Sequence, residues 1–335
     1  MHTSKKILVT GATGLLGSNL VRYLLQSGYT DIRVLHQPSS PARLLQDCAN
    51  RVEWVAGDVL DMAALDNALA GVQWVFHCAG IVSFDSRKAA LLREVNVEGT
   101  ANVVNVSIER GVESLLHVSS IAAIGRTRPG QSISERSKWE RSPLNTRYGI
   151  SKFLGELEVW RGIEEGLSAV IINPAVIIGG GDWTRGPARF FQMMDRGFSF
   201  YPMGATDLVG VRDVVRAMVL LMEQGIRNER FIVSAGKMSY REFFSKVAEA
   251  LGRPAPKRAI LPWIQQVLGG FAWLKSRWSG EESLITRETI RQSALEYVYD
   301  NQKLIQALAF EYTPLEETIQ ETAREFLKAK SEGKD

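Results

Sequence analysis

The sequence lacks the features that mark several classes of protein. Its 335 residues include only two cysteines, Cys48 and Cys78, too few for a disulfide framework, and this predicts a reduced, cytoplasmic location. The formal net charge is only +3, so we expect no nucleic-acid partner. We expect no secretory signal, because an apolar strand pattern follows Met1 within a few residues. The longest charge-free apolar stretch near the C-terminal end, residues 260–274, is too short to span a bilayer.

The first half of the chain alternates short apolar runs with stretches of helical periodicity. The runs predict strands and the periodic stretches predict helices. The predicted strands are Lys6–Thr10, Ile32–His36, Val52–Ala56, Trp74–Cys78, Leu115–Ser119 and Ala169–Asn173. The predicted helices are Leu15–Leu25, Met62–Leu69, Leu91–Glu109 and Gly149–Glu164.

This alternation predicts an α/β fold, a Rossmann-type doubly wound parallel sheet with helices on both faces. We expect a dinucleotide-binding domain over residues 1–175, with a strand and a helix from about 205–234 returning to it. A smaller, mostly helical substrate-binding region would comprise 176–204 and 235–335. Ligands of such sheets bind outside the carboxyl ends of the strands.

A glycine-rich turn joins the first predicted strand to the first predicted helix. Its spacing is G-x-x-G-x-x-G, formed by Gly11, Gly14 and Gly17. We expect Gly11 to permit the tight turn, Gly14 to let the backbone approach a pyrophosphate, and Gly17 to let helix and strand pack closely. A strand-to-helix turn that binds no ligand is the alternative.

Small or polar residues follow four of the predicted strands. They are Gly57–Val59, Cys78–Gly80, Ser119–Ser120 and Asn173–Ala175. Each group alone is ordinary turn chemistry. Because the carboxyl ends of parallel strands share one edge of the sheet, the four groups together predict a lined ligand site.

Tyr148 and Lys152 lie four residues apart, which places them on one face of a helix. A free tyrosine has a pKa near 10, and a neighbouring ammonium is expected to lower the pKa of Tyr148 and make it a general acid or base. Ser120 would hydrogen-bond the substrate oxygen. A pair of surface residues on a helix is the alternative meaning of this pattern.

Together these motifs resemble the extended short-chain dehydrogenase/reductase superfamily, which includes sugar epimerases, dihydroflavonol reductases and 3β-hydroxysteroid dehydrogenases. The resemblance covers nearly the whole chain. Its matching segments are Thr10–Gly17, Gly57–Val59, His77–Gly80, Val95–Thr100, Val118–Gly125, Tyr148–Lys152, Asn173–Gly179 and Val211–Ala217.

The resemblance implies a role for individual residues. Ser120, Tyr148 and Lys152 would be catalytic, Asn96 would support them from the helix behind the site, and no metal is expected. The residues implied in cofactor binding are Gly11, Thr13, Gly14, Leu15, Leu16, Gly17, His36, Gln37, Arg43, Asp58, Val59, Cys78, Ala79, Gly80, Ser119, Tyr148, Lys152, Pro174, Ala175 and Val176.

Departures from the family pattern bear on the reaction. Ser120-Ile121-Ala122 has no acid to protonate a leaving hydroxyl, which argues against dehydration. Thr206 stands where many nucleotide-sugar epimerases have a diphosphate-binding arginine, which weakens that reading without excluding it. We therefore expect hydride transfer between a carbonyl and a secondary alcohol. A nucleotide-sugar epimerase with tightly bound NAD and a non-catalytic dinucleotide sensor or scaffold are the alternatives.

The end of the second predicted strand bears on cofactor preference. It has no carboxylate to bind the ribose hydroxyls of NAD, since Asp31 precedes the strand. Ser39, Ser40 or Arg43 can bind a 2′-phosphate, although Gln37 stands where NADP-dependent relatives often have arginine. We expect NADP(H) to be favoured over NAD(H).

The C-terminal third contains an amphipathic stretch, residues 258–278, with three tryptophans. We expect it to cover a hydrophobic carbonyl substrate. Packing in a small helical core, or contact with a membrane surface or partner, are the alternatives. A homodimer through helices 91–109 and 149–164 is expected only by analogy with relatives.

Overall fold

The computed structural model describes residues 4–40, 42–125, 132–260 and 296–333. Most of the amphipathic stretch 258–278 lies outside the described residues. So do residues 126–131, in the segment between Ser120 and Tyr148. All contacts below belong to the described ranges.

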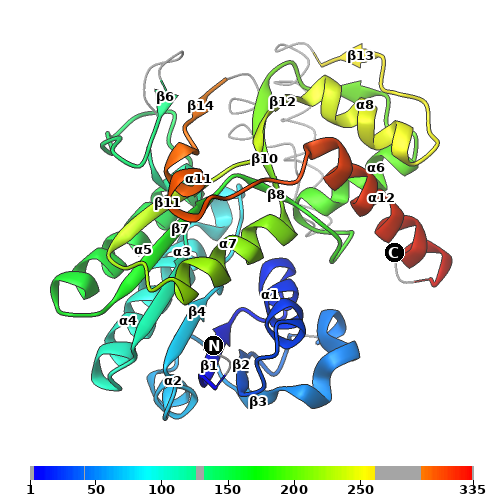
Figure 1. Ribbon diagram of the computed structural model, residues 1–335. Helices are drawn as coiled ribbons and strands as arrows, with labels where there is room; N and C mark the ends of the chain where they lie inside the picture. Colours follow the sequence, from blue (N-terminus) through cyan, green and yellow to red (C-terminus); the bar gives the residue numbers. More distant parts are fainter. Residues whose placement is uncertain (1–3, 41, 126–131, 261–295, 334–335) are drawn as a thin grey trace.

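A seven-stranded parallel sheet forms the centre of the protein and confirms the predicted fold class (Figure 1). The strand order is β11-β7-β5-β4-β1-β2-β3, and every neighbouring pair is parallel. The strands are β1 (Ile7–Thr10), β2 (Ile32–His36), β3 (Glu53–Ala56), β4 (Trp74–His77), β5 (Ser114–Val118), β7 (Ala169–Pro174) and β11 (Glu229–Val233). The order reverses direction at β1: the first two crossovers place β2 and β3 on one side of it, and β4, β5, β7 and β11 follow on the other side.

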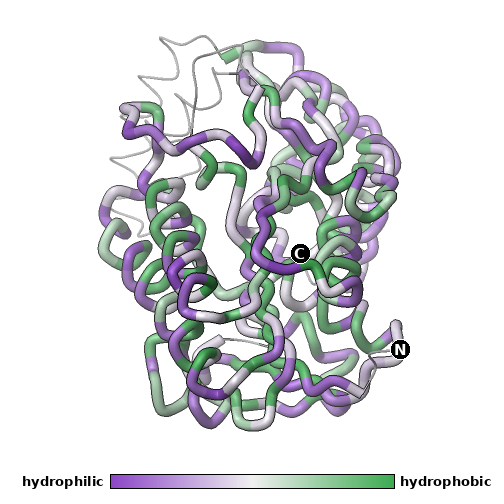
Figure 2. The backbone as a smooth tube through the Cα atoms, turned by 60° about the vertical axis from the view of Figure 1, so that its left-hand side comes forward, coloured by the Kyte–Doolittle hydropathy of each residue, from purple (hydrophilic) through white to green (hydrophobic). Residues whose placement is uncertain are grey.

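Helices cover both faces of this sheet. On one face α1 (Leu15–Gln26) and α7 (Val211–Glu223) pack against Ile7, Val9 and their neighbours. On the other face α2 (Met62–Leu69), α4 (Gly99–Glu109) and α5 (Arg147–Glu164) bury the alternate residues of the same strands. Strand residues on both faces are buried, as expected of a parallel sheet. Figure 2 shows apolar and polar colours alternating along the outer helices.

The helix expected over residues 91–109 is interrupted. Helix α3 (Ala89–Arg93) runs into a π-helical turn, Glu94–Glu98, before α4 begins. Single π turns inside α-helices are rare and are often found at functional sites. Here the turn carries Asn96.

The later part of the chain builds a smaller, separate cluster beside the sheet. Helices α6 (Arg189–Asp195), α8 (Tyr240–Ala250) and α12 (Leu315–Ser331) surround a core that includes Trp183, Phe191 and Phe326. Figure 1 places these helices together on one side of the sheet's upper end. This agrees with a helical C-terminal region. Its boundary at residue 175 stays a prediction.

A second sheet joins the two parts. Strand β10 (Ala205–Gly210) pairs in parallel with β8 (Val176–Ile178) and antiparallel with β12 (Gly236–Ser239). We expected the strand and helix of about 205–234 to return to the main sheet. Helix α7 and strand β11 do so, whereas β10 lies in the second sheet. The remaining described strands form two parallel pairs, β6 (Ser132–Ile133) with β14 (Val298–Tyr299) and β9 (Phe200–Tyr201) with β13 (Arg258–Ala259), and the remaining described α-helix is α11 (Gln302–Leu308).

Candidate active site

The glycine turn lies between β1 and α1, against the end of β4. Gly11 has φ +67°, and a Cβ there would lie 2.6 Å from the Ala79 nitrogen. A Cβ at Gly17 would lie 2.3 Å from the Gly11 carbonyl oxygen. Only glycine fits either position, because real Cβ atoms do not approach backbone atoms so closely. The turn therefore brings α1, β1 and the Cys78–Gly80 segment into direct contact.

The first turn of α1 has the character of an anion site. Gly14 is the N-cap residue, no side chain caps the helix, and no acidic residue occupies its first turn. The first N–H groups of a helix have no partner within it, and the helix dipole favours negative charge there. These features fit the pyrophosphate of a dinucleotide, and the cofactor contacts of Thr13, Leu15 and Leu16 stay predictions.

Behind the turn, buried polar side chains link three elements. The Thr10 hydroxyl accepts a hydrogen bond from the Ala79 N–H at 3.2 Å and lies 2.8 Å from His77 Nδ1. His77 Nε2 lies 3.1 Å from the Thr100 hydroxyl, which donates to the Asn96 carbonyl. Burial, and secondarily the charge of Lys152, lower the pKa of His77 to about 3. His77 is therefore neutral, and it ties β1 and β4 to α4.

Asn96 fixes the segment that follows β4. Its side-chain oxygen accepts from the Ile81 N–H at 2.9 Å, and its amide donates to the Ile81 carbonyl at 3.0 Å. The same amide donates to the Ser151 hydroxyl of α5 at 2.9 Å. With an exposure of 1%, Asn96 is a fully bonded buried amide. It joins the segment beside the glycine turn to the helix that carries Tyr148.

The structure brings Ser120, Tyr148 and Lys152 together at the carboxyl edge of the sheet. Ser120 follows β5, and its side chain lies close enough to the Tyr148 hydroxyl to lower its pKa, against the larger raising effect of burial. Lys152, only 5% exposed, donates to the Val118 carbonyl at 2.7 Å. Phe84 packs edge-on against the Tyr148 ring at 5.9 Å between centroids. Tyr148 and Lys152 thus face the end of β5, which rules out a solvated surface pair.

The pKa of Tyr148 differs from expectation. Burial raises the pKa of this hydroxyl, and the hydrogen bond with Ser120 offsets part of that rise. We expected the Lys152 ammonium to lower it. The expectation is wrong for this structure because Lys152 donates to the Val118 carbonyl, while desolvation disfavours the phenolate. Burial also lowers the pKa of Lys152 to about 8, against a smaller opposing effect of Glu156.

At the adenosine end of the expected cofactor site, the side chains are more exposed to solvent. The Gln37 amide donates to the Asp58 carboxylate, which also accepts from the Leu60 N–H at 3.0 Å. The His36 ring stands edge-on to Trp54 at 5.1 Å between centroids. Arg43 is exposed at the start of a 3₁₀ helix, Arg43–Arg51.

The remaining expected cofactor residues lie on the same edge. Val59 is buried after β3, and Cys78 and Ala79 are partly buried beside Gly11. Pro174 ends β7, Ala175 follows, and Val176 begins β8. Ser119 is buried at the end of β5. The predicted catalytic residues and the predicted cofactor-binding residues therefore lie along the carboxyl edge of the sheet, from β3 to β7.

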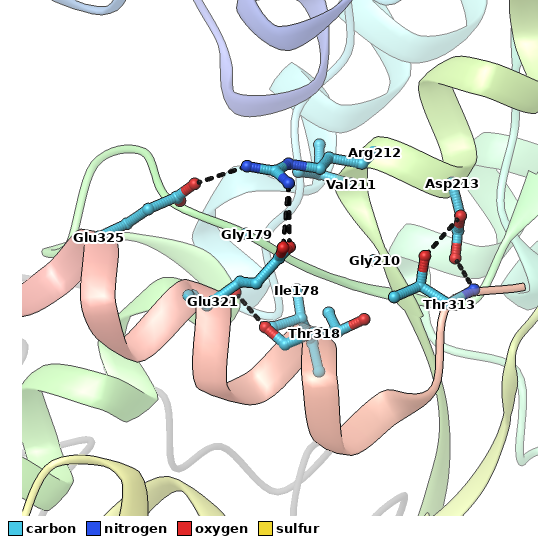
Figure 3. A pocket seen from close by; sticks show the side chains of 11 residues that line it. Ile178, Gly179, Gly210, Val211, Arg212, Asp213, Thr313, Thr318, Glu321 and Glu325 are labelled. Atoms are coloured by element: carbon cyan, nitrogen blue, oxygen red, sulfur yellow. Dashed lines mark hydrogen bonds and ion pairs between the residues drawn. The ribbon is translucent and has the colours of Figure 1, made fainter.

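Arg212 sits apart from this line, at the start of α7. It pairs with Glu321 at 3.1 Å and with Glu325 at 3.7 Å on α12, as Figure 3 shows. The neighbouring Asp213 accepts hydrogen bonds from Thr313. The cavity among these residues holds about 20 Å³, room for about one water molecule. These contacts attach α12 to α7 and leave Arg212 committed to the two carboxylates.

Sequence reasoning missed His77, Thr100, Glu156 and Arg230 as contributors to the site. The first two belong to an apolar strand and a helix, where their partners cannot be read from spacing. Glu156 offered one signal, because it lies four residues after Lys152 and so shares its face of α5.

Among the described residues there is no group of three His, Cys, Asp or Glu side chains that could hold a metal ion. None of the helices that the structure describes is both long and apolar enough to cross a membrane.

Residues 7–234 match the model of the NAD dependent epimerase/dehydratase family. The chain belongs to this family. The match confirms the resemblance to extended short-chain dehydrogenases/reductases, and the protein is an NAD(P)-dependent enzyme of that type.

Similar proteins carry reductase and other names. A putative dihydroflavonol 4-reductase of Synechocystis sp. is 29% identical, over 95% of this chain and 93% of its own. Sterol demethylase protein B of Methylococcus capsulatus is 35% identical over 80% of each chain. The crystal structure of gox2253 superposes with a TM-score of 0.82 at 26% identity, covering 99% of both chains.

Proposed function

We propose that this protein reduces a carbonyl to a secondary alcohol, or catalyses the reverse, with Ser120, Tyr148 and Lys152 as its catalytic residues. The observation that carries the proposal is that Ser120 lies close enough to the Tyr148 hydroxyl to lower its pKa, against the larger raising effect of burial, while the buried Lys152 donates to the Val118 carbonyl at the end of the same strand. A proton donor and an oxygen-binding hydroxyl thus share one point at the end of β5. The nicotinamide of the cofactor supplies or accepts the hydride.

The raised pKa of Tyr148 gives it a defined role in reduction. A phenol that stays protonated at neutral pH can donate its proton to the substrate oxygen as that oxygen gains negative charge. The Ser120 hydroxyl, already positioned beside it, would donate a hydrogen bond to the same oxygen. Lys152, with a pKa of about 8, is protonated at pH 7 and places a positive charge in the site. In oxidation the same groups act in reverse.

The names of relatives agree with this reaction class. Besides the Synechocystis protein, tetraketide alpha-pyrone reductase 1 of Arabidopsis thaliana is 30% identical over 76% of this chain. No acidic side chain accompanies Ser120 in the segment Ile121–Ala123, which supports reduction over dehydration. A nucleotide-sugar epimerase is the second candidate, because the family model includes epimerases.

The test separates these candidates by cofactor stoichiometry. Purified enzyme is incubated with NADPH or NADH and a panel containing a dihydroflavonol, other aromatic ketones and a nucleotide sugar. We expect one cofactor oxidised for each alcohol formed. Epimerised sugar without net cofactor consumption would overturn the reductase proposal in favour of the epimerase.

We also propose a preference for NADP(H). No carboxylate ends β2, and the Asp58 carboxylate beside it is occupied by Gln37 and the Leu60 N–H. Arg43 is exposed nearby in sequence and can receive a 2′-phosphate. We expect a lower KM for NADPH than for NADH. A tenfold preference for NADH would contradict the proposal.

A homodimer through α4 and α5 remains our proposal for assembly. Leu91, Ile150 and Leu157 are exposed apolar residues on α3 and α5. Light scattering should give the mass of two chains, and Leu157→Arg should give that of one. A monomeric wild-type enzyme would contradict it. The cytoplasmic location also stays a prediction.

A further inference from the structure

A buried carboxylate, Glu156, lies one turn after Lys152 on α5. Its exposure is 1%. One carboxylate oxygen accepts from the Ser119 hydroxyl at 2.8 Å and from the Asn173 amide at 2.9 Å. The other accepts from Arg230 at 2.9 Å and from the Trp160 indole at 3.3 Å. Four donors from β5, β7, β11 and α5 therefore converge on a single side chain.

Arg230 carries the connection further, to the chain segment that precedes Tyr148. Its guanidinium donates twice to the Glu135 carbonyl, at 2.9 and 2.6 Å, and once to the Ser137 carbonyl at 3.1 Å. The Glu135 side chain in turn accepts from the Ile232 N–H at 2.9 Å. The Arg230 guanidinium thus bonds both Glu156 and the chain before Tyr148, and these hydrogen bonds fix the 134–137 segment to β11.

The same contacts reach the proposed catalytic residues by two short routes. Ser119, bonded to Glu156, is the immediate neighbour of Ser120. Asn173 donates both to Glu156 and, at 3.0 Å, to the Ser120 carbonyl. Lys152 and Glu156 share one face of α5, so that face is attached to the end of β5 by two adjacent turns.

A buried ion pair with this geometry is costly unless each group is satisfied, and removal of one partner leaves an uncompensated charge. An apolar pair of the same size could fill the volume. It could not accept from Ser119 and Asn173 while also neutralising Arg230. The arrangement therefore specifies a relative position of strand end and helix, beyond filling a core.

We propose that Glu156, held by Arg230, is a positioning residue that fixes Ser120 against Tyr148 and Lys152. The proposal rests on the proposed function of those three residues. The hydrogen bonds of the Glu156 carboxylate go to Ser119, Asn173, Trp160 and Arg230 and not to the Tyr148 hydroxyl, so its action runs through Ser119, Asn173 and the helix.

Charge gives the proposal a second consequence. The ionisable groups around Lys152 are Glu156 and Tyr148 on α5, His77 and Cys78 at the end of β4, and His117 on β5. Burial lowers the pKa of Lys152, while Glu156 and then Cys78 raise it. Both histidines are neutral because burial lowers their pKa values. Without the Glu156 charge the pKa of Lys152 falls further, and its ammonium is lost at lower pH.

The experiment compares Glu156→Gln, Glu156→Asp and Ser119→Ala by kcat/KM against pH, with NADPH and whichever carbonyl of the panel is reduced. Glu156→Gln should lower kcat/KM by about 10- to 100-fold and move the alkaline limb down by about one pH unit. Glu156→Asp keeps the charge, so kcat/KM should fall while the limb stays. Ser119→Ala should lower kcat/KM about tenfold without moving the limb.

Glu165→Gln is the matched control. Glu165 caps the same helix and pairs with Arg161 at 2.7 Å in an exposed position. It should keep wild-type kcat/KM and an unmoved limb. Should Glu156→Gln fail to fold, as judged by circular dichroism, Glu156→Asp and Ser119→Ala decide by the same criteria.

The inference and the proposed function fail in different ways. Wild-type kcat/KM and an unmoved limb in the Glu156 and Ser119 variants, beside an inactive Tyr148→Phe enzyme, would overturn the positioning role alone. Full activity in Tyr148→Phe would overturn the proposed function itself.

Discussion

The two ends of the predicted cofactor site differ in how firmly the protein holds their side chains. Beside Tyr148, the residues Asn96, Lys152 and Glu156 are buried, and each has hydrogen-bond partners on other elements. At the adenosine end, Gln37 and Arg43 are exposed.

The difference indicates where change is tolerated. A buried polar network is held in one arrangement, because each unsatisfied member costs free energy. Exposed residues at strand ends carry no such constraint. We therefore expect substitutions at the reacting end to cost activity and stability together, and those at the adenosine end to alter only cofactor preference.

The largest expected effect is that of Tyr148→Phe. Loss of the hydroxyl removes the proposed proton donor and the partner of Ser120, so kcat should fall by about a thousandfold or more while NADPH still binds. Steady-state kinetics and cofactor fluorescence measure the two effects. Tyr29→Phe is the control. Tyr29 lies just before β2, at the opposite edge of the sheet, and its hydroxyl donates a hydrogen bond to Glu223. Near-normal kcat in Tyr148→Phe would contradict the expectation that substitutions at the reacting end cost activity.

The second prediction concerns pH and His77. Its pKa in the folded protein, about 3, lies below the ordinary 6.5, so the fold favours the neutral ring. Stability from this group is therefore fully present above pH 6.5 and is lost as pH falls towards 3. The loss amounts to about 4 kcal/mol of unfolding free energy. Urea unfolding of wild type and His77→Asn at several pH values measures it.

The variant should show a shallower loss of stability between pH 6.5 and 3. His117, whose ring lies 5.2 Å from that of His77, is present in both proteins, so only its coupling to His77 enters the difference. Equal slopes of unfolding free energy against pH in wild type and His77→Asn would show that the buried hydrogen bonds among Thr10, His77 and Thr100 do not depend on a neutral His77 ring.

The third prediction is the cost of removing the Asn96 amide. Asn96→Ala leaves the Ile81 N–H and carbonyl and the Ser151 hydroxyl without this partner. The unfolding free energy should fall by about 2–3 kcal/mol, and kcat/KM by about tenfold. Asn105 lies on α4 and accepts a hydrogen bond from Arg161. As the control, Asn105→Ala should leave kcat/KM unchanged. Loss of stability without loss of kcat/KM would limit Asn96 to a structural role.

The smallest expected effect is at the adenosine end. Arg43→Ala removes a cation that an exposed 2′-phosphate contact would use, so KM for NADPH should rise about three- to tenfold while KM for NADH is unchanged. Arg51→Ala, at the other end of the same 3₁₀ helix, is the control. An equal rise for both cofactors would contradict the assignment of Arg43 to the 2′-phosphate.

Sequence predicted the first half of the fold well because its signals are local. Apolar runs and periodic stretches alternate there, and the predicted strand Ile32–His36 has the bounds that the structure shows. The second sheet was harder to predict. Strand β12, Gly236–Ser239, is only four residues long and carries Gly, Lys and Ser, so no alternation of apolar residues marks it.

The candidate site divides in the same way. Gly11, Tyr148 and Lys152 were predicted because each belongs to a motif with fixed spacing. Glu156 and its partner Arg230 lie 74 positions apart, and only the folded sheet brings them together. The π turn at Asn96 also escaped prediction, because no residue type or spacing in the sequence marks where a helix changes from i→i+4 to i→i+5 hydrogen bonds.

Transfer of isotope from the cofactor tests the account most directly. The enzyme is given NADPH, or NADH if that is preferred, with deuterium on the transferred position of the nicotinamide ring, and the carbonyl of the panel that it reduces. We predict one deuterium on the carbon that bears the new hydroxyl for each cofactor oxidised, and none with Tyr148→Phe. Cofactor that stays reduced while a nucleotide sugar is epimerised would contradict the account.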